Sequence, residues 1–134
     1  MNAPRITLLP YRVPYADTDK MGVVYYANYL EYFERVRNEM LRDIGLSYKE
    51  IESNGLSLQV IEAYCKYLQP AFYDDMLEIR GWFGDNTRTR ITIHCEIARE
   101  EAPLATGFTI HACLSTRTQK PVRLPPGFLE KMQS

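Results

Sequence analysis

The order in which helical and strand patterns follow one another constrains this chain more than any other feature of its sequence. One strand pattern is followed by a single long helical pattern, then a short helix, and after that only strands. The predicted strands cover residues 5–14, 57–68, 76–84, 88–98 and 104–117, and the predicted helices cover residues 28–43 and 48–53. A run of strands after one long helix is typical of α+β folds, in which an antiparallel sheet carries its helices on one face. We therefore expect an α+β fold with a sheet wrapped around a long central helix.

Residues 28–43 predict an amphipathic helix whose apolar stripe needs a cover. The stripe comprises Leu30, Phe33, Met40 and Ile44, with Val36 and Leu41 beside it. Ser47 is expected to begin the short helix, because Glu50 follows it at the spacing of a capping box. A last helical turn is expected over residues 128–132. The sheet is the natural cover for the stripe of the long helix.

Two of the strand patterns indicate how the sheet is built. Residues 88–98 alternate most cleanly, with Ile91, Ile93, Cys95 and Ile97 on one face and His94 among the polar residues of the other. In the last strand, the residues that share one side are Leu104, Phe108, Ile110, Ala112 and Leu114. Pro10 interrupts the first strand and suits an edge better than the middle of a sheet. An open edge of this kind invites dimerisation.

Length and composition predict a single soluble domain over residues 1–134. A formal net charge of −1 argues neither for nor against a nucleic-acid partner, and no apolar run approaches the ~20 residues that span a membrane. The three cysteines are widely spaced, and residues 1–6 lack the apolar core of a signal peptide. We expect free thiols, a cytoplasmic location, and neither a nucleic-acid nor a membrane partner.

The segment 15–29 concentrates the residues that could carry chemistry. It holds two carboxylates (Asp17 and Asp19), Gly22 and four tyrosines, between a predicted strand and the start of the long helix. The N–H groups at a helix N-terminus favour developing negative charge. A carboxylate beside such an oxyanion-binding helix end is the minimum equipment for hydrolysing an acyl bond.

The same residues also have plain structural interpretations. Asp-Thr-Asp suits a turn, and we expect Asp17 to be structural, bonding backbone groups in its loop. His94 and His111 have no partner spacing that suggests a metal site, so both are expected to be structural. No Gly-x-Ser-x-Gly elbow or glycine-rich phosphate loop is present. We expect neither a metal nor another cofactor.

The segment that begins Asp17-Thr-Asp-Lys-Met-Gly-Val-Val-Tyr-Tyr-Ala-Asn-Tyr29 and continues through Glu39 resembles the signature of the 4-hydroxybenzoyl-CoA thioesterase family. It is also similar to the small acyl-CoA thioesterases associated with the Tol-Pal system. The resemblance spans nearly the whole chain and implies a hotdog fold. It further implies hydrolysis of acyl-CoA without a cofactor, and a homodimer or a tetramer made of two dimers, with active sites at the dimer interface.

The resemblance assigns roles to six residues. Asp19 matches the catalytic carboxylate, acting either as the nucleophile or as a general base on water. The backbone N–H of Tyr26 would polarise the thioester carbonyl, and Gly22 matches a turn glycine of the substrate site. Arg88 and Thr89 match a basic-hydroxyl pair that contacts coenzyme A, with Arg90 as a further candidate.

One position departs from the Tol-Pal type, in which many members have histidine where this chain has Tyr26. Hydrolysis with Asp19 alone is therefore implied. Two other functions stay open at this point: a thioesterase for acyl-carrier protein, and a hotdog protein that binds acyl-CoA without hydrolysing it. The acyl group itself is not predicted, because small changes in a pocket alter specificity by only ~1–3 kcal/mol per methylene.

Overall fold

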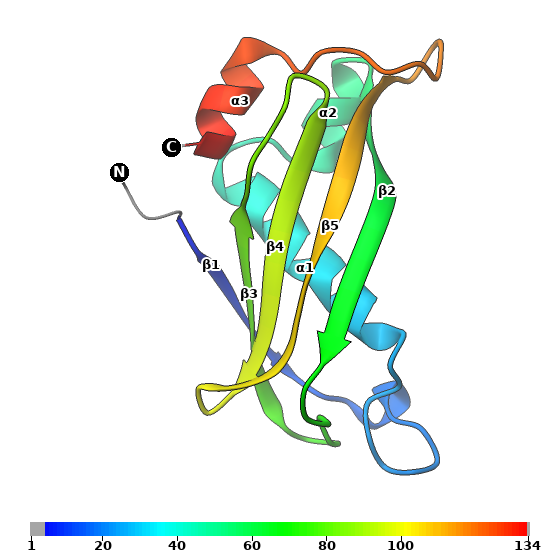
Figure 1. Cartoon of the computed structure of the whole chain (residues 1–134), viewed down its shortest axis with the longest axis vertical. Helices are drawn as coiled ribbons and strands as arrows, with labels where there is room; N and C mark the ends of the chain where they lie inside the picture. The colour runs from blue at the N-terminus through cyan, green and yellow to red at the C-terminus, as the bar shows by residue number, and fades with distance from the viewer. Residues whose placement is uncertain (1–4, 134) are drawn as a thin grey trace.

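The computed structural model describes residues 5–133 and shows one sheet with helices packed against it (Figure 1). The strands are β1 (Thr7–Arg12), β2 (Leu56–Tyr67), β3 (Met76–Phe83), β4 (Arg90–Arg99) and β5 (Ala102–Ser115). The helices are the short 3-10 turn η1 (Tyr15–Asp17), α1 (Asn28–Asp43), α2 (Tyr48–Ser53) and α3 (Pro126–Gln133). Each element predicted from the sequence is present, with ends that differ by a few residues. The Ser47 hydroxyl accepts the backbone N–H of Glu50 at 3.3 Å, which confirms the predicted cap of α2.

The sheet has the strand order β1-β3-β4-β5-β2, and every neighbouring pair is antiparallel. Helix α1 crosses one face of this sheet and packs most extensively against β1 and β3 (Figure 1). This arrangement is the expected α+β hotdog fold. Pro10 lies in β1, an edge strand, as its missing N–H group required.

The core lies between α1 and the sheet. Ile91, Ile93, Cys95 and Ile97 of β4 are all buried on the face toward α1, which confirms the clean alternation read from the sequence. The buried face of α1 is more aromatic than predicted. It consists of Tyr29, Tyr32, Phe33, Val36, Arg37, Met40 and Leu41.

Leu30 was wrongly placed in the apolar stripe, because its side chain is 41% exposed. Tyr29, Leu30, Glu31 and Tyr32 follow Asn28 at the start of the helix, and Tyr29 and Tyr32 take the inward positions. The helical wheel alone does not account for this exposure, because Arg37 and Leu41 lie within about 20° of Leu30 on the wheel and are buried two to three turns further along. Leu30 differs from them in lying in the first turn of the helix.

The apolar side of β5 points away from α1. Phe108 pairs with His94, and Ile110 pairs with Thr92, both on the face opposite the buried isoleucines of β4. The inward residues of β5 are instead Thr109, His111 and Cys113. Pairing with β4 fixes this register, because a shift by one residue would exchange the two faces.

Strand β2 forms the second edge and exposes apolar side chains. Val60, Ile61, Tyr64 and Tyr67 are each 45–50% exposed, and a bulge between Val60 and Glu62 interrupts the pairing with β5. Long apolar edges of this kind are sites for pairing with another chain. No helix in the part of the chain described here is long and apolar enough to cross a membrane.

Candidate active site

The candidate site is built on the connection between η1 and α1, residues 18–27, which we call the Asp19 loop. The chain folds back on itself there, because Thr18 pairs with Val24 and the Asp19 N–H donates to the Val23 carbonyl at 2.8 Å. The Gly22 N–H closes the turn on the Asp19 carbonyl at 3.0 Å, and Gly22 has a φ of +82°. A side chain would strain that backbone, so the conformational role predicted for Gly22 is confirmed.

The Asp19 carboxylate is half-buried and held through only one of its oxygens. Oδ1 accepts the backbone N–H groups of Met21 at 2.8 Å and Val23 at 3.4 Å. Oδ2 accepts no hydrogen bond from any residue between 5 and 133. The loop therefore fixes the orientation of the carboxylate and leaves one oxygen open for chemistry.

The N-terminus of α1 is uncapped. Ala27 occupies the N-cap position without a side-chain hydrogen bond. The backbone N–H groups of Tyr26 and Ala27 find no acceptor among the described residues. Free N–H groups at the positive end of a 16-residue helix are suited to an oxyanion.

Asp17 is structural, as expected, although its side chain does not bond the backbone. Its Oδ2 atom accepts two hydroxyl groups, from Tyr11 of β1 and Tyr32 of α1, each at 2.7 Å. Burial and this carboxylate raise the pKa of Tyr11 to about 12, and the same two causes raise the pKa of Tyr32. The main-chain carbonyl of Asp17 accepts the N–H of Tyr25 and the Asn28 side chain, both at 2.9 Å. Asp17 thus links the sheet, the Asp19 loop and the helix start.

A pocket of about 290 Å³ opens beside Tyr26. It is lined by Val24, Tyr26, Tyr29, Tyr67, Leu68, Gln69 and Pro70. The rings of Tyr29 and Tyr67 stack at 4.9 Å, and the Tyr67 hydroxyl donates to the Tyr26 carbonyl at 2.9 Å. Burial is the main reason why the pKa of Tyr67 rises to about 12. The aromatic walls of this pocket suit an apolar group of a ligand.

The sequence did not identify Tyr11, Tyr32 or Tyr67 as neighbours of this site. Only the abundance of tyrosine signalled their presence, and an aromatic residue in a strand is ordinarily core or interface material. The hydroxyl groups of these tyrosines bond residues that are distant in sequence. These contacts form only when β1, β2 and α1 pack together, so the sequence alone does not predict them.

Arg88, Thr89 and Arg90 lie at the other end of the sheet. They precede and begin β4, beside the segment after β5, where the Arg88 carbonyl accepts the Leu124 N–H at 2.7 Å. Figure 1 shows the β3–β4 connection at the top of the molecule and the Asp19 loop at the bottom. A ten-residue strand spans about 30 Å. Within a single chain, Asp19, Gly22 and Tyr26 therefore share one loop, whereas Arg88, Thr89 and Arg90 lie at the far end of β4.

Both histidines lie outside the Asp19 loop. His111 is fully buried, with Nε2 2.9 Å from the Thr109 hydroxyl, and burial and the nearby Arg37 lower its pKa to about 4. His94 stacks on Trp82 at 5.8 Å on the outer face of the sheet. All three cysteines are free thiols. Across residues 5–133, no three His, Cys, Asp or Glu side chains are grouped so that they could hold a metal ion.

Comparison with known proteins identifies the family. A model of the thioesterase-like superfamily matches residues 13–132, so the chain belongs to this superfamily. The acyl-CoA thioester hydrolase YbgC of Escherichia coli O6:H1 is 32% identical over 125 residues, covering 92% of this chain and 93% of that protein. The 1,4-dihydroxy-2-naphthoyl-CoA hydrolase of Synechococcus elongatus is 27% identical over 123 residues, covering 90% of each chain.

A solved structure with the same architecture is the DHNA-CoA thioesterase of Staphylococcus aureus. It superposes with a TM-score of 0.88 at 31% identity, over 94% of this chain and 87% of that one. The fold, the superfamily and these relatives together make the protein an enzyme, a thioester hydrolase.

Proposed function

We propose that this enzyme is an acyl-CoA thioesterase of the 4-hydroxybenzoyl-CoA type, with Asp19 as its catalytic carboxylate. The observation that carries the proposal is the pairing, in one loop, of a half-free carboxylate with an uncapped helix N-terminus. Two relatives are named as hydrolases of coenzyme A thioesters, and this supports a coenzyme A thioester as the substrate.

The chemistry follows from these two features. The N–H of Tyr26 would donate to the thioester oxygen and stabilise the negative charge that develops as the carbonyl carbon is attacked. Asp19 would attack that carbon through Oδ2, expel the thiolate of coenzyme A and leave an anhydride that water hydrolyses. Alternatively, Asp19 would take a proton from an attacking water and return it to the leaving thiolate. Both routes give the free acid and coenzyme A.

The acyl group is proposed to occupy the tyrosine-lined pocket beside Tyr26. The pocket adjoins the free N–H of Tyr26, so an acyl chain there would leave its carbonyl near the helix end. Gly22 would let the loop backbone approach the substrate closely, since it has no side chain.

We further propose that the active unit contains two copies of the chain, as a homodimer or as a dimer within a tetramer. The Asp19 loop and β2 expose apolar residues that a partner would cover, among them Met21 at 85% and Tyr26 at 63%. If the β2 edges of two copies pair antiparallel, each Asp19 loop lies beside the opposite end of the other sheet. Arg88, Thr89 and Arg90 of one copy would then reach coenzyme A bound at the Asp19 of the other. A cytoplasmic location is proposed on the three free cysteines.

The test is release of free thiol from short and long aliphatic, benzoyl and hydroxybenzoyl coenzyme A esters. Asp19→Asn is expected to lower kcat about 10²-fold or more while the protein keeps its fold and its oligomeric state. Asp17→Asn is not a suitable control, because that side chain holds the site together, whereas the exposed Asp85→Asn is suitable. Turnover that does not depend on Asp19 would rule out the mechanism. If the enzyme hydrolyses the thioester between an acyl group and acyl-carrier protein but no coenzyme A ester, its substrate is the carrier-protein thioester.

A further inference from the structure

The segment 70–75 lies directly against the Asp19 loop. The Val24 N–H donates to the Ala71 carbonyl at 2.8 Å, and Val23 pairs with Phe72. The Ala71 N–H in turn donates to the Tyr29 hydroxyl at 3.3 Å, and both Ala71 and Val24 are buried. This segment therefore supports the stretch of chain that leads from Asp19 to the start of α1.

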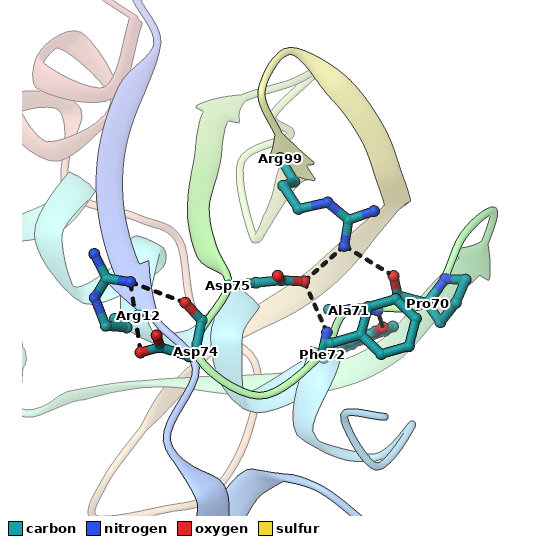
Figure 2. Close-up of polar contacts among 8 residues, drawn as sticks. Arg12, Pro70, Ala71, Phe72, Asp74, Asp75 and Arg99 are labelled. Carbon is teal, nitrogen blue, oxygen red and sulfur yellow. Dashed lines mark hydrogen bonds and ion pairs between the residues drawn. The ribbon is translucent and has the colours of Figure 1, made fainter. Parts of the chain in front are cut away.

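Arg99, the last residue of β4, reaches across to the segment and contacts both Asp75 and Pro70, as Figure 2 shows. Its Nη1 donates to Asp75 Oδ2 at 2.6 Å and to the Pro70 carbonyl at 3.2 Å. Asp75 Oδ2 also accepts the Phe72 N–H at 2.8 Å, and the Arg99 guanidinium lies 5.8 Å from the centre of the Phe72 ring. Charge-assisted hydrogen bonds are about twice as strong as neutral ones. Both side chains are also largely shielded from water, with exposures of 26% for Arg99 and 22% for Asp75.

We propose that Arg99 and Asp75 form a positioning clamp for the proposed active site. Val23 supplies an N–H to Asp19 Oδ1 at 3.4 Å, and Val24 lies two residues before Tyr26, whose N–H is free. A displacement of segment 70–75 would move Val23 and Val24 and so change how the carboxylate and the helix N–H face each other. Neither Arg99 nor Asp75 need touch the substrate, so they are positioning residues. This inference rests on the proposed role of Asp19.

A neighbouring ion pair offers a matched control. Arg12 of β1 contacts the same turn from the other side, with Nη1 2.8 Å from the Asp74 carbonyl and 3.5 Å from Asp74 Oδ1 (Figure 2). Its side chain is 56% exposed and that of Asp74 is 64% exposed. Backbone bonds between Val13 and residues 74 and 75 hold this side of the turn without Arg12. Exposed ion pairs of this kind contribute little to the stability of a folded protein.

The experiment compares Arg99→Ala, Arg99→Lys and Arg12→Ala in steady-state hydrolysis of the best coenzyme A ester. Arg99→Ala is expected to lower kcat about 10–100-fold, because small misplacements of reacting groups have effects of that size. KM should change by less than about threefold, since substrate contacts are kept. Added guanidinium, far below the concentrations that unfold the chain, should restore part of the kcat lost in Arg99→Ala. Arg99→Lys should retain part of the wild-type kcat.

The control variant Arg12→Ala should match the wild type. An unchanged kcat in Arg99→Ala, or an equal loss in Arg12→Ala, would overturn the clamp.

Amide hydrogen exchange separates failure of the clamp from failure of the proposed function. The Val24 N–H is bonded to Ala71, so its exchange should accelerate at least about tenfold in Arg99→Ala and stay unchanged in Arg12→Ala. A wild-type protein that hydrolyses no thioester would refute the function, yet faster exchange of Val24 would still support the clamp. Unchanged exchange at Val24 would refute the clamp, whatever the activity.

Discussion

Mild acid should destabilise this protein through one buried side chain, His111 of β5. The ring is fully buried on the face of the sheet toward α1, and its Nε2 atom lies 2.9 Å from the Thr109 hydroxyl. Arg37 of α1, itself only 7% exposed, adds a positive charge nearby. Burial first, and Arg37 second, lower the pKa of His111 from 6.5 to about 4, because both disfavour the imidazolium.

The sign and size of the effect follow from proton linkage. Between pH 6.5 and 4 the unfolded chain binds a proton at His111 that the folded chain does not, so acid favours unfolding. The stabilisation is fully present above pH 6.5 and is lost as the pH falls toward 4. The difference between the two pKa values corresponds to roughly 3 kcal/mol, of which about 2 kcal/mol is lost between pH 7 and 5. That is a large fraction of the stability of an ordinary domain.

Urea unfolding followed by the fluorescence of Trp82 measures this loss at pH 5, 6, 7 and 8, at one fixed protein concentration. His111→Gln should remove most of the pH dependence, whatever its effect on stability at pH 7. His94→Gln removes the other histidine and should keep the dependence, since His111 is still present. A direct titration of the His111 ring by NMR checks the cause. An apparent pKa near 6.5 in the folded protein, or an equal pH slope in His111→Gln, would refute the reasoning.

Two further predictions concern the stability of the fold. Gly107→Ala should destabilise the protein by about 3 kcal/mol or more, because a Cβ there would lie 2.1 Å from the Tyr64 carbonyl and 2.8 Å from the Phe33 ring. Gly127→Ala, which has open space around it, is its control in urea unfolding and should be neutral or slightly stabilising. Asp17→Asn should destabilise by about 1–3 kcal/mol, because two tyrosine hydroxyls lose a charged acceptor. The same assay should find exposed Asp85→Asn nearly neutral, and equal effects of the two substitutions would contradict the role of Asp17.

Local sequence patterns predicted the helices and strands well, because each pattern was compatible with only one kind of secondary structure. The alternation of residues 91–97 and the capping of α2 by Ser47 depend on neighbours in sequence, and the structure confirms both. The burial of α1 was harder to predict, since Leu30 and Tyr29 are both apolar enough to face the core. The packing of α1 on β1 and β3 decides between them, and no local rule contains that information.

The candidate site divides in the same way. Asp19, Gly22 and Tyr26 lie within eight residues of one another, so a motif could group them, and the φ of Gly22 confirms the turn. Arg88 to Arg90 lie at the opposite end of β4 from the Asp19 loop, so a motif in one chain could not group them with Asp19, and their proposed role depends on the proposed pairing of two copies. The sequence did not identify Arg99 and Asp75 as part of the site, because neither belongs to a motif. The role proposed for them depends on the antiparallel pairing of β3 with β4, which brings Arg99 at the end of β4 within 2.6 Å of Asp75 just before β3.

The two aspartates of Asp17-Thr18-Asp19 have opposite environments, and that contrast supports the different roles proposed for them. The side chain of Asp17 accepts two tyrosine hydroxyls from elements before and after it in sequence, so its charge stabilises the packing of β1 against α1. Asp19 is held by backbone N–H groups of its own turn through Oδ1 alone, so its second oxygen stays available. The Thr18 hydroxyl donates to the Tyr15 carbonyl at 2.7 Å and closes the turn of residues 15–18. Asp17 thus fixes the packing beside the Asp19 loop, and Asp19, the proposed catalytic carboxylate, keeps one oxygen without a hydrogen bond two residues further along the chain.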